Sequence, residues 1–378
     1  MGNTITGLIP HIYDAVDIVS RELVGFIPSV YKNAAAEQVA LNQNITYPIV
    51  PAADAVDISP SNILPELPDT EYGHGTMAVT KARAHRFHWT GDDQASLERG
   101  TKDELSQGKL AQGFRVLANE IEADLAALYT KASRAYGTPG TTPFATAGDF
   151  TDASEIARIL KDNGAPTSAM RLVINTAAGA QIIGKQSQAH MVGATDPLRR
   201  GVLLDIAGLK IRESAQVRQH VAGTGKDYLV NNADGIAVGS TAIAADTGTG
   251  TIISGDIVSF AADNGSKYVV SGELAGGSFS VAAPGSRVDI PDDNAITLGS
   301  GYAANMAFTS DAIHLLARLP KRPEEGDMAD DIMVVQDPVS GLFFEVAVYP
   351  AYRAVIIEIS IAWGVKAAKP EHMALLLG

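Results

Sequence analysis

The segment from Thr101 to Tyr136 limits the possible folds most, because it is the longest uninterrupted run of helical periodicity in the chain. Thr101 with Glu104 three residues later is typical of a capping box, and Gly137 with Pro139 is typical of a helix stop. A helix of this length measures about 50 Å, so we expect a strut to which other elements attach. Its apolar side chains form one stripe: Leu110, Phe114, Leu117, Ile121, Leu125 and Leu128.

Composition narrows the class of protein. The chain has 378 residues, of which 43 are acidic and 29 basic, giving a formal net charge of −14. This excess of acid argues against a protein whose main task is to grip nucleic-acid phosphates. The absence of cysteine excludes disulfides and thiolate metal sites. We find no secretory signal and no apolar run of membrane-spanning length, so we expect a soluble protein made in the cytoplasm.

The first part of the chain combines a short helix with extended segments. Residues 1 to 33 are predicted to hold an amphipathic helix with Ile12, Val16, Val19 and Leu23 on one face. The stretch from 34 to 69 is rich in proline, which indicates an extended arm that wraps another structure.

Residues 76 to 89 alternate with period two, which predicts a strand. Lys81 and Arg83 share one face with Phe87 and Trp89. The segment is much longer than the usual strand of about 5 or 6 residues, so we expect it to project from the body.

The middle of the chain changes pattern twice. Between 137 and 233, helices at 154–163 and 177–187 and strands at 170–175, 208–213 and 227–231 predict an α/β unit. From 234 to 300 the sequence is dense in Gly, Ser and Thr, with short β-prone runs that predict a small all-β module inserted into that unit. These runs lie at 250–260, 267–272, 278–282 and 295–298.

The end of the chain is predicted to be a sheet. A hairpin spans 332 to 348, and the segment 352 to 363 is a third strand. Val355, Ile357, Ile359, Ile361 and Trp363 lie on one face of that strand. We expect the strut helix to cover this apolar face.

Motifs for catalysis or ligand binding are incomplete. Residues 223–226, GTGK, lack the first glycine and the hydroxyl residue of a phosphate-binding loop. His85 and His88 point to opposite faces of a strand, so we do not expect them to chelate a metal ion together. The acidic turn 289–294 indicates a solvated turn more than a calcium site. We therefore expect no enzyme, no cofactor and no metal.

Three short segments carry a resemblance to a known family. They are Gly255 to Phe260, then Phe308 to Ile313 leading into Leu319 and Pro320, and Trp363 to Val365 followed by Ala368 to Glu371. In sequence and in order they are similar to segments of the major capsid proteins of tailed bacteriophages. The resemblance is closest to the coat proteins of short-tailed phages that carry an inserted β-barrel domain.

The resemblance implies an α+β fold of the phage major-capsid type, with a small inserted all-β domain. The implied parts are an N-terminal arm at 1–69, an extended loop at 70–100, a peripheral domain with its spine helix at 101–136 and 328–378, an axial domain at 137–233 and 301–327, and the inserted domain at 234–300.

The resemblance also implies a function. Copies of the chain would assemble as pentamers and hexamers into the icosahedral shell of a virion that encloses double-stranded DNA. The implied partners are other copies of itself, a scaffolding protein and a portal, with a decoration protein as a further option. DNA would be met only by non-specific proximity, and no membrane is involved. Before assembly the chain would reside in the host cytoplasm.

An asymmetry of charge suggests where copies meet. Lys81, Arg83 and Arg86 make the extended loop the most basic short stretch of an acidic chain. We expect them to form salt links to a neighbouring copy. The acidic partners are expected in one segment: Glu324, Glu325, Asp327, Asp330 and Asp331.

Two other interpretations remain open. A β-rich tail-associated or surface binding protein without catalysis would account for the module at 234–300, but leaves the strut without a purpose. An α/β hydrolase would use the unit at 137–233, yet the chain has no Gly-x-Ser-x-Gly motif.

Overall fold

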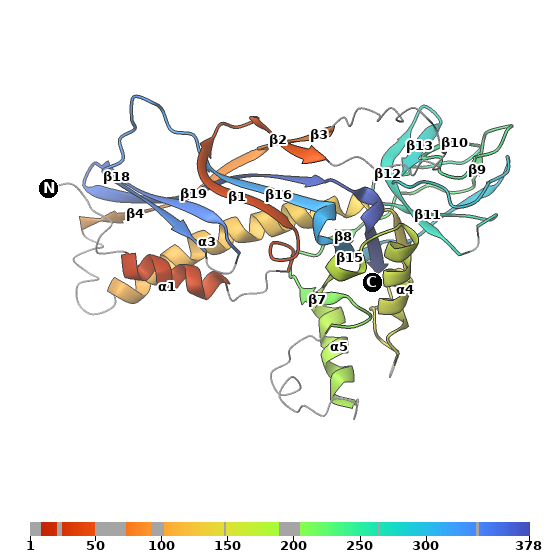
Figure 1. Ribbon diagram of the computed structural model, residues 1–378, viewed down its shortest axis with the longest axis horizontal. Helices are drawn as coiled ribbons and strands as arrows, with labels where there is room; N and C mark the ends of the chain where they lie inside the picture. The colour runs from red at the N-terminus through yellow and green to blue at the C-terminus, as the bar shows by residue number, and fades with distance from the viewer. Residues whose placement is uncertain are drawn as a thin grey trace, which may run out of the picture.

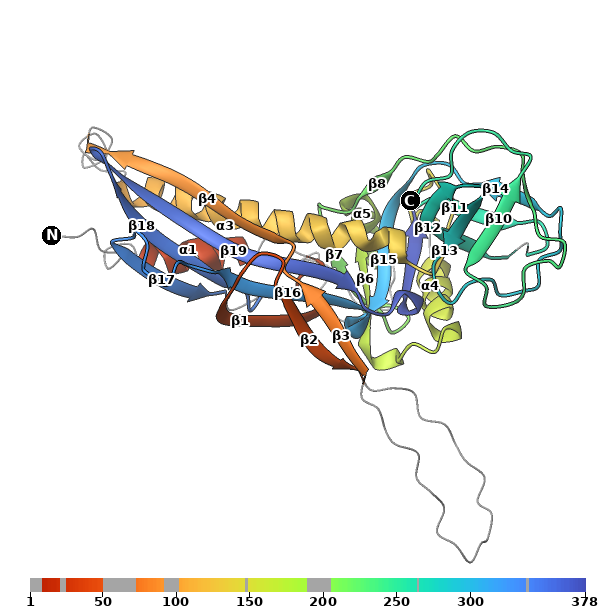
Figure 2. The same cartoon turned by 90° about the horizontal axis from the view of Figure 1, so that it is seen from above.

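The computed structural model describes residues 9–20, 25–49, 73–91, 102–146, 149–188, 205–263, 265–337 and 340–378. The fold is mixed α and β, with more sheet than helix. The body is elongated, and helix α3 (Lys102–Ala126) runs along one half of it (Figures 1 and 2). In these ranges no helix is both long enough and apolar enough to cross a membrane.

The apolar stripe predicted for the strut is buried in α3, where Leu110, Phe114 and Ile121 are at most 1% exposed. The predicted end at Tyr136 is wrong. The α-helix stops at Ala126, a 3-10 turn follows, and β5 (Arg134–Tyr136) is a strand. The reason is tertiary, because β5 pairs with β20 (Met373–Leu377) on one side and β12 (Lys267–Ala275) on the other, and this pairing overrides helix propensity.

A first sheet lies against α3. Its central strand β19 pairs with β4 on one side and with β18 and β16 on the other, while β17 and β1 lie beyond these. Phe114 meets Phe344 edge to face at 5.1 Å between ring centroids. The prediction that the strut covers the C-terminal sheet is confirmed, because Ile359, Ile361 and Trp363 are buried in the core that α3 shares. The strands are β1 (Tyr31–Val39), β4 (Lys81–Thr90), β16 (Ile313–Pro320), β17 (Asp331–Gln336), β18 (Phe343–Ala351) and β19 (Ala354–Ala367).

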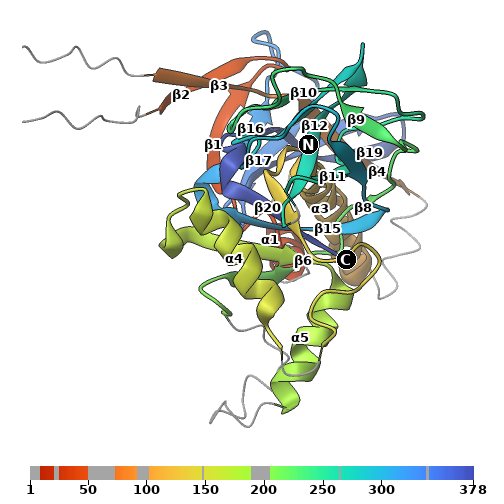
Figure 3. The same ribbon diagram turned by 90° about the vertical axis from the view of Figure 1, so that its right-hand side faces the viewer.

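The prediction that residues 76 to 89 project as one strand is wrong. The strand breaks at Val79 and Thr80, and β4 pairs with β19 along its whole length. Packing explains the difference, because Trp89 is buried and Phe87 packs against the α3 core. The projecting element is instead the pair β2 (Asn44–Ile49) and β3 (Gly73–Ala78), which stands out from the body in Figures 2 and 3.

The N-terminal segment folds largely on its own chain. Helix α1 (Ile9–Ser20) buries Ile12, Val16 and Val19 in the core that includes α3, as its periodicity predicted. Strand β1 runs parallel to β16 in the first sheet, so residues 34 to 39 pair within their own chain, where an arm that wraps another structure was predicted. Leu23 and residues 50 to 69 lie outside the described residues.

A second sheet begins at β5 and continues through β20, β15 (Tyr302–Thr309), β6 (Met170–Ile174) and β7 (Lys210–Glu213), and β8 (Gln219–His220) also pairs with β15. Helix α4 (Thr151–Asp162) and helix α5 (Thr176–Gln188) pack on this sheet and share one core with it (Figure 3). The helices and strands predicted between 154 and 213 are therefore confirmed to within a few residues, whereas the strand predicted at 227–231 belongs to the next module and not to this unit.

The module at the far end of the body is a closed ring of strands with its own core, which includes Tyr228, Ile243 and Phe279. Around the ring, β11 pairs with β14, β14 with β9, β9 with β10, β10 with β13, β13 with β12, and β12 with β11. Strand β9 precedes residue 234, and β10 had no counterpart among the predicted strands. The ring strands other than β12 are β9 (Tyr228–Val230), β10 (Ala242–Asp246), β11 (Ile257–Phe260), β13 (Ser278–Val281) and β14 (Ala295–Leu298).

Candidate functional site

The basic residues at the start of β4 contact α3 of their own chain. Lys81 Nζ lies 2.8 Å from Asp124 Oδ1 and 3.3 Å from Glu120 Oε1. Arg83 Nε lies 3.2 Å from the same Glu120 oxygen. The hydrogen bond to Asp124 raises the pKa of Lys81, with Glu120 adding to the effect against partial burial. These two cations therefore already have partners within the chain.

Arg86 lies on the other face of β4, where it hydrogen-bonds Glu358 of the adjacent strand β19. This bond raises the pKa of Arg86. The arginine side chain remains 68% exposed. Of the predicted basic residues, Arg86 is thus the most accessible to another molecule.

The predicted acidic residues lie before and at the start of β17. Glu324 is 90% exposed and lies 3.9 Å from Lys321, while Glu325 is exposed. Asp331 Oδ1 accepts the backbone N–H of Ile332, and the backbone N–H of Asp330 donates to Val348. The segment therefore presents carboxylates next to the β17 edge.

Asp327 fixes this acidic segment to the sheet. It lies 3.4 Å from Arg322 Nη1 and accepts a hydrogen bond from the Tyr349 hydroxyl at 3.1 Å. Arg322 in turn contacts the buried carboxylate of Glu345 at 2.9 Å. Burial, followed by the nearby charge of Glu358, raises the pKa of Tyr349 to about 12. Asp327 therefore attaches the acidic segment to the sheet, while Glu324 and Glu325 are exposed.

The structure does not bring the basic and acidic sets together within one chain. They lie at opposite edges of the first sheet, and neither β4 nor β17 has a strand partner beyond that edge among the described residues. The two edges are in register across the sheet. Arg86 of β4 lies opposite Glu358 of β19, which lies opposite Ala347 of β18, and Ala347 lies opposite Ile332 of β17. Ile332 is 44% exposed at the β17 edge. Edges of this kind are templates for pairing with another chain.

The sequence missed a buried carboxyl group in the middle of α3. Glu122 is fully buried, and its Oε2 accepts the backbone N–H of Phe26 at 3.0 Å and the hydroxyl of Ser214 at 2.9 Å. Burial raises the pKa of Glu122, against the opposing effect of its hydrogen bonds. No local signal separates Glu122 from the partly buried Glu120 and Asp124 of the same helix, because its partners come from distant parts of the chain.

Three solved particle structures are similar to most of this chain. The capsid structure of cyanophage P-SCSP1u has a TM-score of 0.48 and 11% identity, covering 91% of this chain and 86% of that chain. The mature capsid of bacteriophage PhiM1 has a TM-score of 0.41 and 10% sequence identity, covering 93% of this chain and 86% of that chain. A virus-like particle from Pyrococcus furiosus has a TM-score of 0.44 and 9% sequence identity, covering 98% of this chain and 99% of that chain. No protein-family model and no curated protein matches the chain.

The chain is thus similar to phage capsid structures. This is the class of protein that the sequence segments resemble.

A second buried network joins the ring of strands to the rest of the body. His220 Nε2 donates to Asp256 Oδ1 at 2.9 Å, and the Tyr129 hydroxyl lies 2.9 Å from His220 Nδ1. Because a carboxylate only accepts, Nε2 carries the proton of the hydrogen bond to Asp256. Asp256 also accepts the backbone N–H groups of Gly223 and Ile253.

The motifs discounted from sequence have structural partners. Asp289 and Asp292 accept backbone N–H groups of Val238 and Asn232, which closes turns of the ring. Thr224 of the GTGK segment hydrogen-bonds Thr251. Among the described residues no group of three His, Asp or Glu side chains is placed to hold a metal ion.

Proposed function

We propose that this chain is a major capsid protein that assembles into the icosahedral shell around the double-stranded DNA genome of a tailed bacteriophage. One observation carries the proposal: the first sheet has a basic edge at β4 and, in register with it across the sheet, an edge at β17 that adjoins an acidic segment. A contact between the β4 edge of one copy and the β17 edge of the next is heterologous, so it repeats and can close into rings. Pentamers and hexamers are rings of this kind.

The charges at the two edges support this contact. Arg86 is exposed and level with Ile332, whereas Lys81 and Arg83 would have to share or exchange Glu120 and Asp124. Each exposed ion pair contributes only about 0.2–1 kcal/mol, which suits a shell built from many reversible contacts. We retain as proposed contact residues the two sets named from the sequence. They are Lys81, Arg83 and Arg86 on one copy, with Glu324, Glu325, Asp327, Asp330 and Asp331 on the next.

We assign the parts of the fold accordingly. Helix α3 would be the spine helix, the first sheet the peripheral domain, and the second sheet with α4 and α5 the axial domain. The ring of strands would be the inserted domain, starting at β9 rather than at residue 234. The chain would act without catalysis in the virion shell and reside in the host cytoplasm beforehand. A scaffolding protein and a portal would be partners, with a decoration protein as an option.

Sedimentation and negative-stain microscopy of the purified chain, with and without the scaffolding protein, test the proposal. We expect free subunits together with large closed or aberrant hollow shells. A strictly monomeric or dimeric species at high concentration, with scaffold supplied, contradicts it. Small defined oligomers that never grow would favour the alternative, a β-rich tail-associated or surface binding protein.

A further inference from the structure

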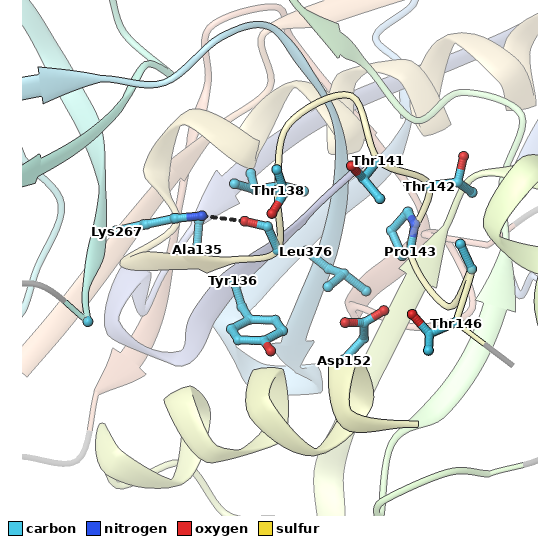
Figure 4. A pocket seen from close by; sticks show the side chains of 14 residues that line it. Ala135, Tyr136, Thr138, Thr141, Thr142, Pro143, Thr146, Asp152, Lys267 and Leu376 are labelled. Atoms are coloured by element: carbon cyan, nitrogen blue, oxygen red, sulfur yellow. Dashed lines mark hydrogen bonds between the residues drawn. The ribbon is translucent and has the colours of Figure 1, made fainter. Parts of the chain in front are cut away.

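A polar pocket of about 290 Å3 lies where the second sheet meets the ring of strands. Figure 4 shows Lys267 and Thr138 on one side of it, and Thr142, Thr146 and Asp152 on the other. The pocket is much larger than the share of one water molecule in the liquid, about 30 Å3. It can therefore accept a small polar group.

The loop from 137 to 146 shapes the pocket. Gly137 has φ +103°, and a Cβ there would come within 2.9 Å of the Leu377 carbonyl oxygen, so a larger residue is excluded. The buried ring of Phe144 anchors the other end of the loop, and its backbone N–H donates to Asp152 Oδ2 at 2.6 Å. The loop is held in place at both ends, and its threonines line the pocket.

Lys267 supplies the positive charge of the pocket. It pairs with Ala135 in the β12–β5 ladder, and its ammonium donates to the carbonyl of Gly137, which leaves further N–H donors. Among the described residues no carboxylate forms an ion pair with it. Burial lowers the pKa of Lys267. A partly buried ammonium without a counter-ion is stabilised by any anion that reaches it.

We infer that this pocket binds a carboxylate group, with Lys267 as its counter-ion and the hydroxyls of the 137–146 loop as hydrogen-bond donors. Asp152 also lines the pocket, and its negative charge repels a doubly charged ligand such as phosphate more strongly than a singly charged carboxylate. The carboxylate can come from a small molecule in solution or from an acidic side chain of a second copy.

Site-specific acetylation of lysine, read by mass spectrometry of the unassembled full chain, tests the inference. N-acetyl-glutamate amide is the carboxylate probe and inorganic phosphate the comparison. We expect millimolar probe to slow acetylation of Lys267 several-fold, with phosphate much less effective. Lys210, exposed on β7, is the internal control, and its rate should not change.

Two variants check that binding depends on the charge. In ligand-observed NMR titrations, K267M should weaken binding of the probe at least 10-fold, while K267R, which keeps the charge, and K210M should bind like the parent. Circular dichroism verifies that each variant folds. Equal binding by K267M and the parent, or no protection of Lys267 by the probe, would overturn the inference.

The source of the carboxylate is read from assembled particles. If an acidic side chain of a second copy fills the pocket, Lys267 should be protected in particles without probe. If a small molecule does, protection should still require the probe. Both results support a carboxylate site, and because binding is measured on unassembled chains, its failure would not bear on shell assembly.

Discussion

Glu122 Oε1 accepts the backbone N–H of Ile27 at 2.6 Å, although the two residues are far apart in the chain. The same carboxyl group holds Phe26 and Ser214, so it joins α3 to the segment after α1 and to the residue after β7. A helix that packs on several elements needs such a connection where apolar contacts alone would leave backbone donors unpaired.

Removing this carboxyl group should destabilise the subunit strongly. In E122A the N–H groups of Phe26 and Ile27 and the hydroxyl of Ser214 lose their acceptor, at about 1–3 kcal/mol for each donor left buried and unpaired. Urea unfolding of unassembled subunits measures the loss. E155A is the matched control, since Glu155 pairs with Arg158 on the surface and should change stability by less than about 1 kcal/mol. Similar losses in both variants would show that Glu122 is not a structural connection.

The raised pKa of Glu122 predicts a pH dependence. Burial makes the folded state bind the proton more readily than the unfolded chain, whose glutamate has the ordinary value of 4.5. The stability that protonation of Glu122 contributes is therefore fully present below pH 4.5 and is lost as the pH rises through the folded pKa. The free energy of unfolding of the parent minus that of E122Q should fall with rising pH in this window, by at most about 1.4 kcal/mol per pH unit. A difference independent of pH would refute the assignment.

The network at His220 should behave as a junction between the ring and the second sheet. D256A leaves the His220 Nε2–H and the backbone N–H groups of Gly223 and Ile253 without an acceptor. We expect its loss of stability in urea unfolding to exceed that of Y129F several-fold. Y129F removes only the hydrogen bond between the Tyr129 hydroxyl and Nδ1 and should cost about 1 kcal/mol. Equal effects would mean that Asp256 contributes no more than one ordinary hydrogen bond.

Local periodicity predicted much of this fold, because the residues that define it are neighbours in sequence. The stripe of α3 from Leu110 to Leu125 and the inward face of β19 from Ile357 to Trp363 both follow from spacing alone. Pairing between strands that are distant in the sequence does not follow from residue spacing. The pattern of β4 shows an apolar face at Trp89, but nothing in it indicates that β19 lies along its whole length.

In the candidate site, too, the sequence indicates the residues but not their partners. The charges of Lys81 and Arg86 are evident from composition, yet their partners Asp124 and Glu358 depend on the register of β4 against α3 and β19. Spacing alone did not indicate the burial of Glu122, since the segment that covers it, around Phe26 and Ile27, carries no helical or strand pattern. Sequence therefore located the charges, and the tertiary structure decided which of them remain available.

The ring of strands should fold only when it is complete. Strand β9 pairs with both β10 and β14, and its Tyr228 and Val230 belong to the ring core. A fragment of residues 226–300 should give a dispersed amide spectrum, whereas 234–300, which lacks β9, should not, because two strands lose their neighbour. A folded 234–300 fragment would show that β9 is dispensable, and two unfolded fragments would show that the module needs the rest of the body.

The final prediction concerns the contact between copies. If the β4 edge of one subunit meets the acidic segment beside β17 of the next, reversing exposed charges on either side should weaken assembly without unfolding the subunit. Reversal of Lys81 and Arg83 is not a clean test, because both hold α3 of their own chain. R86E on one side and E324K/E325K on the other avoid this difficulty, although Arg86 also loses Glu358.

Each reversal should raise the concentration needed for assembly about 2- to 5-fold, the equivalent of one exposed ion pair per subunit, and more at low salt than at high salt. Combining R86E with E324K/E325K should restore much of the loss, since the opposed charges are again complementary. E273K, an exposed glutamate on β12, is the control for a change in net charge alone. Light scattering against subunit concentration at two salt concentrations gives the measurement. If the combined variant assembles no better than its two parents, Arg86 and the two glutamates do not face one another across the contact, and their charges serve only to solvate the two edges of the sheet.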